Sequence, residues 1–110
     1  MDKANAIIKA RAYSKLVNAF INVERIILFG SYAKGTQRKN SDIDIAIVVK
    51  RMDIGFFDVE PVLWRLRREI DPLIEPVLVE EENDPSGFLD EIIKSGVVIY
   101  SKDHVGIGVS

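Results

Sequence analysis

The sequence contains no cysteine among its 110 residues. Disulfide bonds and zinc–thiolate centres are therefore excluded, and so is the disulfide-rich scaffold of small secreted domains. No apolar run approaches the roughly 18 residues that a membrane-spanning helix requires. The N-terminus also lacks the basic-then-apolar profile of a signal peptide. We therefore predict a cytoplasmic protein with no membrane partner.

An excess of positive charge is missing as well, since the formal net charge is −2 and the isoelectric point is about 5.4. A protein that holds nucleic acid by neutralising phosphates is usually basic, so we do not expect nucleic acid as the main partner. Basic residues still cluster at two places: Lys34, Arg38 and Lys39, and Arg65, Arg67 and Arg68. The second cluster is predicted to be a solvated helix face.

The length and composition are those of one small globular domain. Its 47% hydrophobic content is enough for a single buried core. The chain is too short for a catalytic core joined to a separate acceptor domain. We predict a domain over residues 1–100 and a C-terminal tail over residues 101–110.

Hydrophobic periodicity predicts an α/β fold, in which helices cover a sheet of three or four strands. Pro61 favours a regular helix that begins at that residue, and Pro76 favours an edge position for its strand, because proline cannot donate a backbone hydrogen bond. Helices are expected over residues 2–20, 31–34, 56–70 and 86–94, and strands over residues 23–29, 41–49, 73–79 and 97–100.

The segment from Ile26 to Val49 carries the densest chemical pattern. Asp42 and Asp44 are two residues apart on an expected strand, so both carboxylates leave one face while the intervening isoleucines enter the core. Adjacent like charges repel, and a sequence that builds such a pair usually has a cation to fill it. Oxygen ligands in a site completed by phosphates suit Mg²⁺.

Gly30 and Ser31 supply the second half of the pattern at the end of the preceding strand. Glycine lets a backbone approach a ligand closely, and the N–H groups and hydroxyl that follow can hold phosphate. The rival phosphate motif, the P-loop, matches from Gly30 to Gly35 but fails at Thr36 and Gln37, where Lys-Ser/Thr is required. Lys34 or Arg38, on the loop facing the expected phosphates, would neutralise triphosphate charge; the sequence leaves open which one does so.

An Asp-x-Asp pair taken alone is most often a solvated strand face. The order of the parts favours a functional site: a strand, Gly30-Ser31, a polar loop, Asp42 and Asp44, and a third acid later in the chain. With this order the chain resembles the nucleotidyltransferase superfamily that includes DNA polymerase β, and at this length its minimal nucleotidyltransferase branch. The resemblance extends from the first helix to about Tyr100 and implies a mixed sheet.

The resemblance implies transfer of a nucleoside monophosphate, most simply AMP from ATP, to an acceptor hydroxyl, with two Mg²⁺ ions in the active complex. Asp42 and Asp44 would ligate Mg²⁺, and Glu75 would complete the ion that activates the acceptor. Gly30 and Ser31 would hold the β- and γ-phosphates. The third acid is often Asp in relatives, so Glu75 departs from the pattern by one methylene.

Strand alternation cannot separate Glu75 from Asp71 as the third acid, because both positions have the same parity. Asp71 precedes Pro72 at the entrance of the strand, where a carboxylate commonly serves a turn. Glu75 lies among apolar residues inside the strand, where a charge is costly unless it finds a cation. We therefore predict Glu75 as the third ligand.

The resemblance also raises a second class of function. Small members of this superfamily are often paired with a helical HEPN protein as toxin and antitoxin. The chain would then modify its partner, or only mask it with little or no turnover. Antibiotic modification is disfavoured because relatives with that activity carry an added acceptor-binding domain. The acceptor, the base preference and the formation of a homo-oligomer are left open.

Overall fold

The computed structural model describes residues 1–52 and 56–102, and the side chains of residues 56 and 57 are also outside that description. The predicted tail over residues 101–110 therefore lies outside the described residues from position 103 onward. Among the described helices, none is long and apolar enough to cross a membrane.

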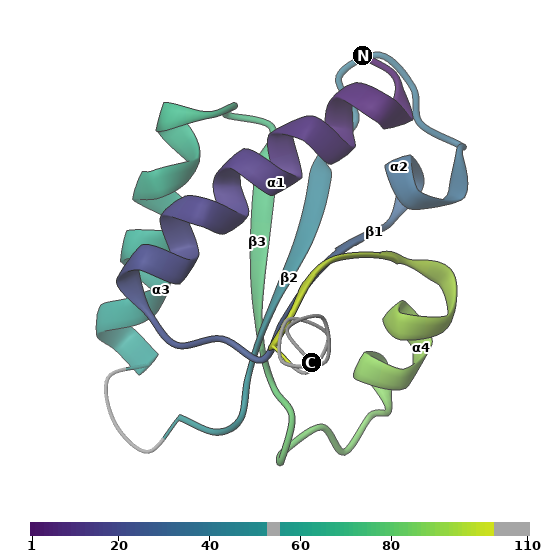
Figure 1. The fold of residues 1–110 in the computed structure, drawn as a ribbon. Coiled ribbons are helices and arrows are strands. Elements are labelled where there is room, and N and C mark those ends of the chain that lie inside the picture. Colours follow the sequence, from purple (N-terminus) through teal and green to yellow (C-terminus); the bar gives the residue numbers. More distant parts are fainter. Residues whose placement is uncertain (53–55, 103–110) are drawn as a thin grey trace, which may run out of the picture.

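Helices and strands alternate along most of the chain, as the periodicity predicts (Figure 1). A short 3₁₀ turn, Arg67–Glu69, separates the third helix from the strand that follows it. The elements are α1 (Lys3–Phe20), β1 (Arg25–Phe29), α2 (Ser31–Lys34), β2 (Ile43–Val49), α3 (Phe56–Leu66), β3 (Ile74–Glu80), α4 (Phe88–Ser95) and β4 (Val97–Ser101).

The four strands form one mixed sheet in the order β3-β2-β1-β4. β1 is antiparallel to both of its neighbours, whereas β2 and β3 are parallel. The fold is thus a small α/β domain, and the mixed sheet that the resemblance implies is confirmed. β2 is central and is buried on both faces, as its apolar sequence predicts.

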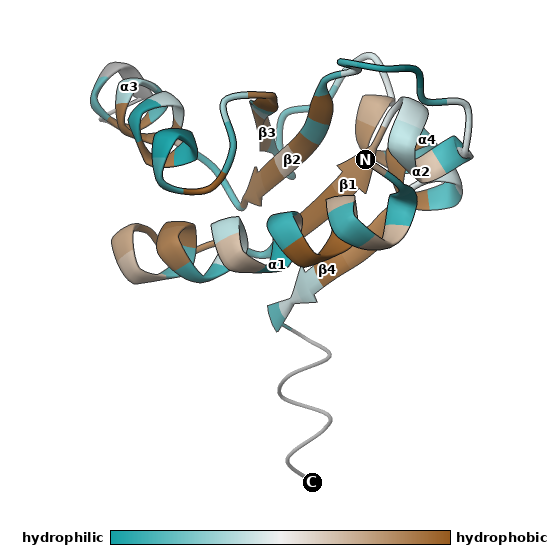
Figure 2. Cartoon of the chain, turned by 90° about the horizontal axis from the view of Figure 1, so that it is seen from above, coloured by the Kyte–Doolittle hydropathy of each residue, from teal (hydrophilic) through white to brown (hydrophobic). Residues whose placement is uncertain are grey.

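Two clusters of buried side chains lie on opposite faces of the sheet. Helices α1 and α3 cover one face, and α4 covers the other, with the hydrophobic strands between them (Figure 2). Alternation along β2 sends Ile43, Ile45 and Ile47 to the α1 and α3 side and sends Ala46 and Val48 to the α4 side. The isoleucines next to Asp44 therefore enter the core, as predicted.

The start of the helix predicted over residues 56–70 is confirmed, because α3 begins at Phe56. The prediction that its regular part begins only at Pro61 is wrong, because the proline lies inside α3. Proline removes one hydrogen bond from a helix interior and is unfavourable there. Three apolar side chains of α3 nevertheless pack against the core cluster, namely Val59, Leu63 and Leu66. Tertiary packing therefore outweighs the local cost of Pro61.

The prediction for Pro76 is confirmed, because β3 is an edge strand of the sheet. Pro76 pairs in register with Ile45 of β2. Its missing N–H costs no ladder bond when it faces the open edge.

Candidate active site

A sharp turn at Gly30 joins β1 to α2. Gly30 has φ +74°, a left-handed conformation that side-chain-bearing residues rarely adopt. A Cβ atom at this position would overlap Oδ2 of Asp44 and would lie 3.0 Å from its Cγ. Glycine is therefore required twice here, and the turn brings a bare backbone against the carboxylate of Asp44.

Asp42 and Asp44 lie at the start of β2, beside this turn. Asp42 is exposed and Asp44 is half-buried, whereas Ile43 between them is fully buried. Asp44 pairs across the sheet with Phe29, the last residue of β1 before Gly30. The end of β1 and the start of β2 therefore meet at one end of the sheet.

Glu75 joins this group from β3. The parallel register places Glu75 directly opposite Asp44, one residue after the pairing of Ile43 with Ile74. Directly paired residues of neighbouring strands project from the same face of a sheet. The structure therefore gathers Asp42, Asp44 and Glu75, the three acids chosen from the sequence, beside Gly30.

The three carboxylates interact electrostatically. Burial raises the pKa of Asp44, and the charge of Asp42 raises it further, while a hydrogen bond with Glu75 opposes the rise. The pKa of Glu75 is raised by a hydrogen bond with Asp42, by burial and by both aspartates, and the charge of Arg67 opposes this rise. Without a cation, the group therefore favours retention of a proton.

The donor set fits Mg²⁺, because it consists of carboxylate oxygens next to a backbone turn that a side chain would block. Within the described part of the chain, however, no three acidic or histidine side chains already have the arrangement of a metal-ligand cluster.

The other predicted nucleotide-binding residues lie on or after the Gly30 turn. Ser31 is the first residue of α2 and is half-buried, and Lys34 is its exposed last residue. Arg38 is exposed on the loop that leads to β2, where its N–H donates to Oγ of Ser41 at 2.8 Å. This last bond fixes the loop immediately before Asp42.

Asp71, the rejected alternative for the third acid, is occupied by structural bonds. Its Oδ1 accepts a hydrogen bond from the N–H of Leu73 at 2.7 Å, and its Oδ2 pairs with Lys9 of α1. Burial alone would raise the pKa of Asp71, but the bonds from Lys9 and Leu73 outweigh it and lower the pKa. Asp71 therefore serves the turn before β3.

The prediction of a solvated helix face holds for Arg65 and Arg68, which are exposed, but is wrong for Arg67, which is half-buried and hydrogen-bonded. Its Nη1 donates to the carbonyl of Pro72 at 2.8 Å and to the carbonyl of Ile74 at 3.1 Å. Its guanidinium also lies 4.7 Å from the ring centroid of Trp64. The one signal in the sequence is the three-residue spacing from Trp64 to Arg67, which places both on one side of a helical turn.

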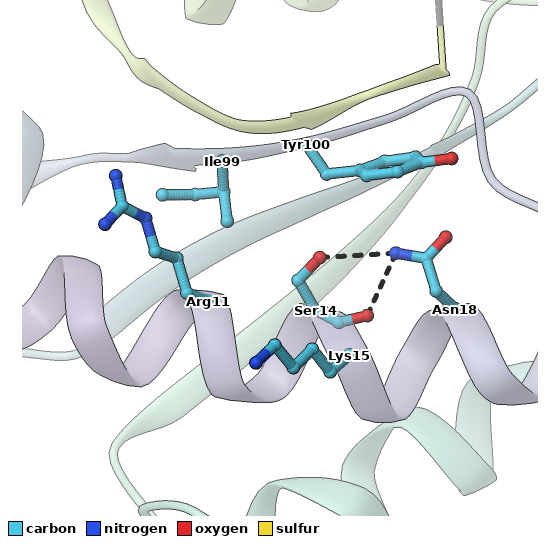
Figure 3. A pocket seen from close by; sticks show the side chains of 6 residues that line it. All are labelled: Arg11, Ser14, Lys15, Asn18, Ile99 and Tyr100. Carbon is cyan, nitrogen blue, oxygen red and sulfur yellow. Dashed lines mark hydrogen bonds between the residues drawn. The ribbon is translucent and has the colours of Figure 1, made fainter. Parts of the chain in front are cut away.

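A cavity of about 520 Å³ lies elsewhere, between α1 and β4. Figure 3 shows its lining, in which the amide of Asn18 donates to the carbonyl and hydroxyl oxygens of Ser14. The lining residues are Arg11, Ser14, Lys15, Asn18, Ile99 and Tyr100. It contains none of the three acids, so we assign the chemistry to the carboxylates rather than to this cavity.

Comparison with known proteins places these residues in a family context. The family model described as polymerase beta, nucleotidyltransferase, matches residues 13–105. The matched range includes the Gly30 turn and all three acids.

Individual relatives agree with the family match. A protein of Methanocaldococcus jannaschii named protein adenylyltransferase is 34% identical over 79 residues, which cover 70% of this chain and 79% of the relative.

Two solved structures share the fold. A nucleotidyltransferase from Sulfolobus solfataricus has a TM-score of 0.66 at 22% identity, with 92% of this chain and 85% of that chain covered. A complex of the tri-AMPylated HEPN toxin of Shewanella oneidensis with its MNT antitoxin gives a TM-score of 0.59 at 18% identity, with 92% and 76% covered.

Proposed function

Because the chain belongs to the polymerase β nucleotidyltransferase family, we propose that it transfers AMP from ATP to a hydroxyl group of a partner protein. The observation that carries this proposal is the pairing of Asp44 with Glu75 beside the Gly30 turn. It brings carboxylates together with a backbone turn that carries no side chain, which supports a site for a metal-bound triphosphate.

The reaction exchanges a phosphoanhydride bond of ATP for a phosphate ester bond to the acceptor. The acceptor oxygen forms a bond to the α-phosphorus of ATP, and the bond between that phosphorus and the oxygen bridging to the β-phosphate breaks. Pyrophosphate leaves with the bonding electrons, and the hydroxyl proton passes to solvent. Mg²⁺ ions, when bound, would neutralise the triphosphate oxygens and lower the pKa of the acceptor hydroxyl.

Each site residue has a role in this proposal. Asp42 and Asp44 would hold Mg²⁺ with the triphosphate, and Glu75 would complete the ligand set on the side of the acceptor. The half-buried position of Asp44 and its contact with the Gly30 turn favour it as the acid nearest the phosphates.

The Gly30 turn holds the triphosphate itself. Gly30 and Ser31 offer backbone N–H groups and a hydroxyl to the β- and γ-phosphates. Lys34 and Arg38 supply positive charge from the exposed loop that follows.

The partner that we propose is a helical HEPN-type protein that presents a Tyr, Ser or Thr hydroxyl. The name of the M. jannaschii relative, protein adenylyltransferase, supports a protein acceptor. The S. oneidensis neighbour supports the partner class, because that complex contains an AMPylated HEPN toxin and an MNT antitoxin. The same neighbour supports an alternative, in which the chain masks such a toxin with little or no turnover.

The acceptor can be identified with ATP labelled at the α-phosphate. The full chain, Mg²⁺ and the protein encoded by the adjacent reading frame should give label on that protein, and Asp42→Asn with Asp44→Asn should abolish it. A stable complex that forms equally well with this double variant, without label, would support masking alone. Label on free tRNA or on an aminoglycoside, with none on protein, would contradict a protein acceptor.

A further inference from the structure

Three consecutive carbonyl groups at the entrance of β3 are all hydrogen-bonded, and two of them share one donor. Nη1 of Arg67 donates to the carbonyls of Pro72 at 2.8 Å and Ile74 at 3.1 Å. The carbonyl of Leu73, between them, accepts from the N–H of Ile43 at 2.8 Å. The start of β3 is therefore held from both sides.

The residues that make these bonds are chain neighbours of the three acids. Ile43 lies between Asp42 and Asp44, and Glu75 follows Ile74 on β3. Alternate residues of a strand in a parallel ladder direct their carbonyls to opposite edges. The carbonyl of Leu73 therefore faces β2, while the carbonyl of Ile74 faces the open edge of the sheet. At this edge Arg67 supplies the hydrogen-bond donor that a neighbouring strand would otherwise provide.

Arg67 is itself fixed in place at both its backbone and its side chain. Its own carbonyl accepts from the N–H groups of Ile70 at 3.0 Å and Asp71 at 2.8 Å. Its guanidinium lies over the ring of Trp64 on the preceding turn of α3. One residue thus bonds to both ends of the connection from α3 to β3.

We propose that Arg67 is a positioning residue whose guanidinium holds the entrance of β3 so that Glu75 lies beside Asp44. The catalytic consequence rests on the proposed function, whereas the clamp itself is a property of the free protein. Lysine keeps the positive charge but lacks the planar guanidinium, which stacks on the indole of Trp64 while its Nη1 donates to both carbonyls. Arg67→Lys should therefore fail to hold the entrance of β3.

Two variants and one control test this role. Arg67→Lys keeps the charge, Arg67→Met removes it, and Arg68→Met changes an exposed neighbour of the same type. The first measurement is amide hydrogen exchange over residues 70–78 of the free chain. The second is binding of Mn²⁺ to the free chain by electron paramagnetic resonance. The third is the separate effect on kcat and on KM for Mg-ATP.

Both Arg67 variants should exchange about 10-fold faster over residues 70–78, because the clamp that limits local opening is lost. Both should bind Mn²⁺ more weakly. In transfer assays kcat should fall about 10- to 100-fold, the scale expected when a reacting group is misplaced by about 1 Å, while KM for Mg-ATP stays within about 3-fold. Arg68→Met should match wild type in every measurement.

The proposal would be overturned if Arg67→Lys had the same hydrogen exchange and the same kcat as wild type. It would also be overturned if the Arg67 variants exchanged faster but kept wild-type kcat and Mn²⁺ binding, because Arg67 would then have a structural role only. Absence of transfer by the wild-type chain would contradict the proposed function instead. The exchange and Mn²⁺ comparisons would still decide whether Arg67 positions Glu75.

Discussion

Two acidic residues four positions apart, Asp71 and Glu75, are assigned opposite roles by their surroundings. Asp71 is engaged by Lys9 and by the N–H of Leu73, whereas Glu75 faces Asp44 across the sheet. Glu75→Gln should cut nucleotidyl transfer by at least about 100-fold, the scale of a lost charge-stabilising group, with nucleotide binding largely kept.

Asp71→Asn is the matched comparison and should leave transfer within a few-fold of wild type. Both variants are to be compared in steady-state transfer assays alongside ATP-binding titrations. If Asp71→Asn loses activity and Glu75→Gln keeps it, the third ligand is Asp71.

Gly35 is the comparison for Gly30, because both residues have φ near +75°, although ψ is −152° at Gly30 and 20° at Gly35. A Cβ at Gly35 would meet nothing within 4 Å, whereas a Cβ at Gly30 would overlap the Asp44 carboxylate. Gly35→Ala should therefore cost only the backbone strain, about 1 kcal/mol of unfolding free energy. Gly30→Ala should cost more and should also abolish Mg-ATP binding, as measured by urea denaturation and calorimetric titration. Mg-ATP binding that survives Gly30→Ala as well as it survives Gly35→Ala would refute the role of the close approach at Gly30.

The paired strands β2 and β3 predict how stability responds to pH. Burial and neighbouring charges raise the pKa of Asp44 and Glu75. A carboxyl whose folded-state pKa lies above its unfolded value stabilises the fold fully below the unfolded pKa, and this contribution is lost as pH rises through the folded pKa. The effect of Asp71 has the opposite sign, because its pKa is lowered.

In metal-free buffer, the unfolding free energy of wild type relative to Asp44→Asn with Glu75→Gln should therefore fall as pH rises from about 4 toward neutrality. Urea denaturation in the presence of a chelator, repeated across this range, measures the difference. Asp71 is present in both proteins and cancels. A difference that stays flat or grows with pH would show that the two carboxyls are not destabilised by their neighbours.

A buried hydroxyl links α1 to α3 within the apolar core. Tyr13 is fully buried and donates to the carbonyl of Leu63 at 2.6 Å, and its burial raises its pKa. Tyr13→Phe should lower the unfolding free energy by about 1 to 2 kcal/mol, because a buried carbonyl loses a donor. Tyr100→Phe is the control, since Tyr100 is only half-buried beside a cavity. Equal stability of the two variants in urea denaturation would contradict the link.

Most elements could be predicted from the sequence, because they depend on local periodicity. Alternation places Ile43 and Ile45 inside and the aspartates outside, and Pro76 identifies an edge strand. Pro61 misled the assignment of α3, because packing of the helix against the core outweighs a local propensity. Arg67 was missed because its bonds reach carbonyls that only the turn into β3 brings near.

The candidate site also has a part that the sequence predicts and a part that it does not. The grouping of Asp42, Asp44 and Gly30 follows from one continuous segment, so the sequence contains the necessary information. The proximity of Glu75 depends on the parallel register of β2 and β3, which residue patterns alone do not determine. The resemblance to a known family implied that Glu75 lies near the two aspartates, and the register of Asp44 with Glu75 agrees with that implication.

At the scale of the whole molecule, the described residues form a small α/β domain with the candidate site at one end of its sheet, and the chain has a net charge of −2. The net charge of −2 includes the three acids, whose negative charges are concentrated at one place, so a bound cation would relieve their mutual repulsion as it recruits the triphosphate. ATP and Mg²⁺ should therefore stabilise the protein together more than either does alone.

Thermal unfolding of the free chain with Mg²⁺, with ATP and with both tests this account most directly, because it needs no knowledge of the acceptor. Ligand at about 100 times Kd should add roughly 2.7 kcal/mol to the unfolding free energy. Asp42→Asn with Asp44→Asn should abolish that gain while the metal-free fold stays at least as stable as wild type. A melting temperature that does not respond to millimolar Mg-ATP, or a double variant that fails to fold, would contradict a nucleotide site built on these acids.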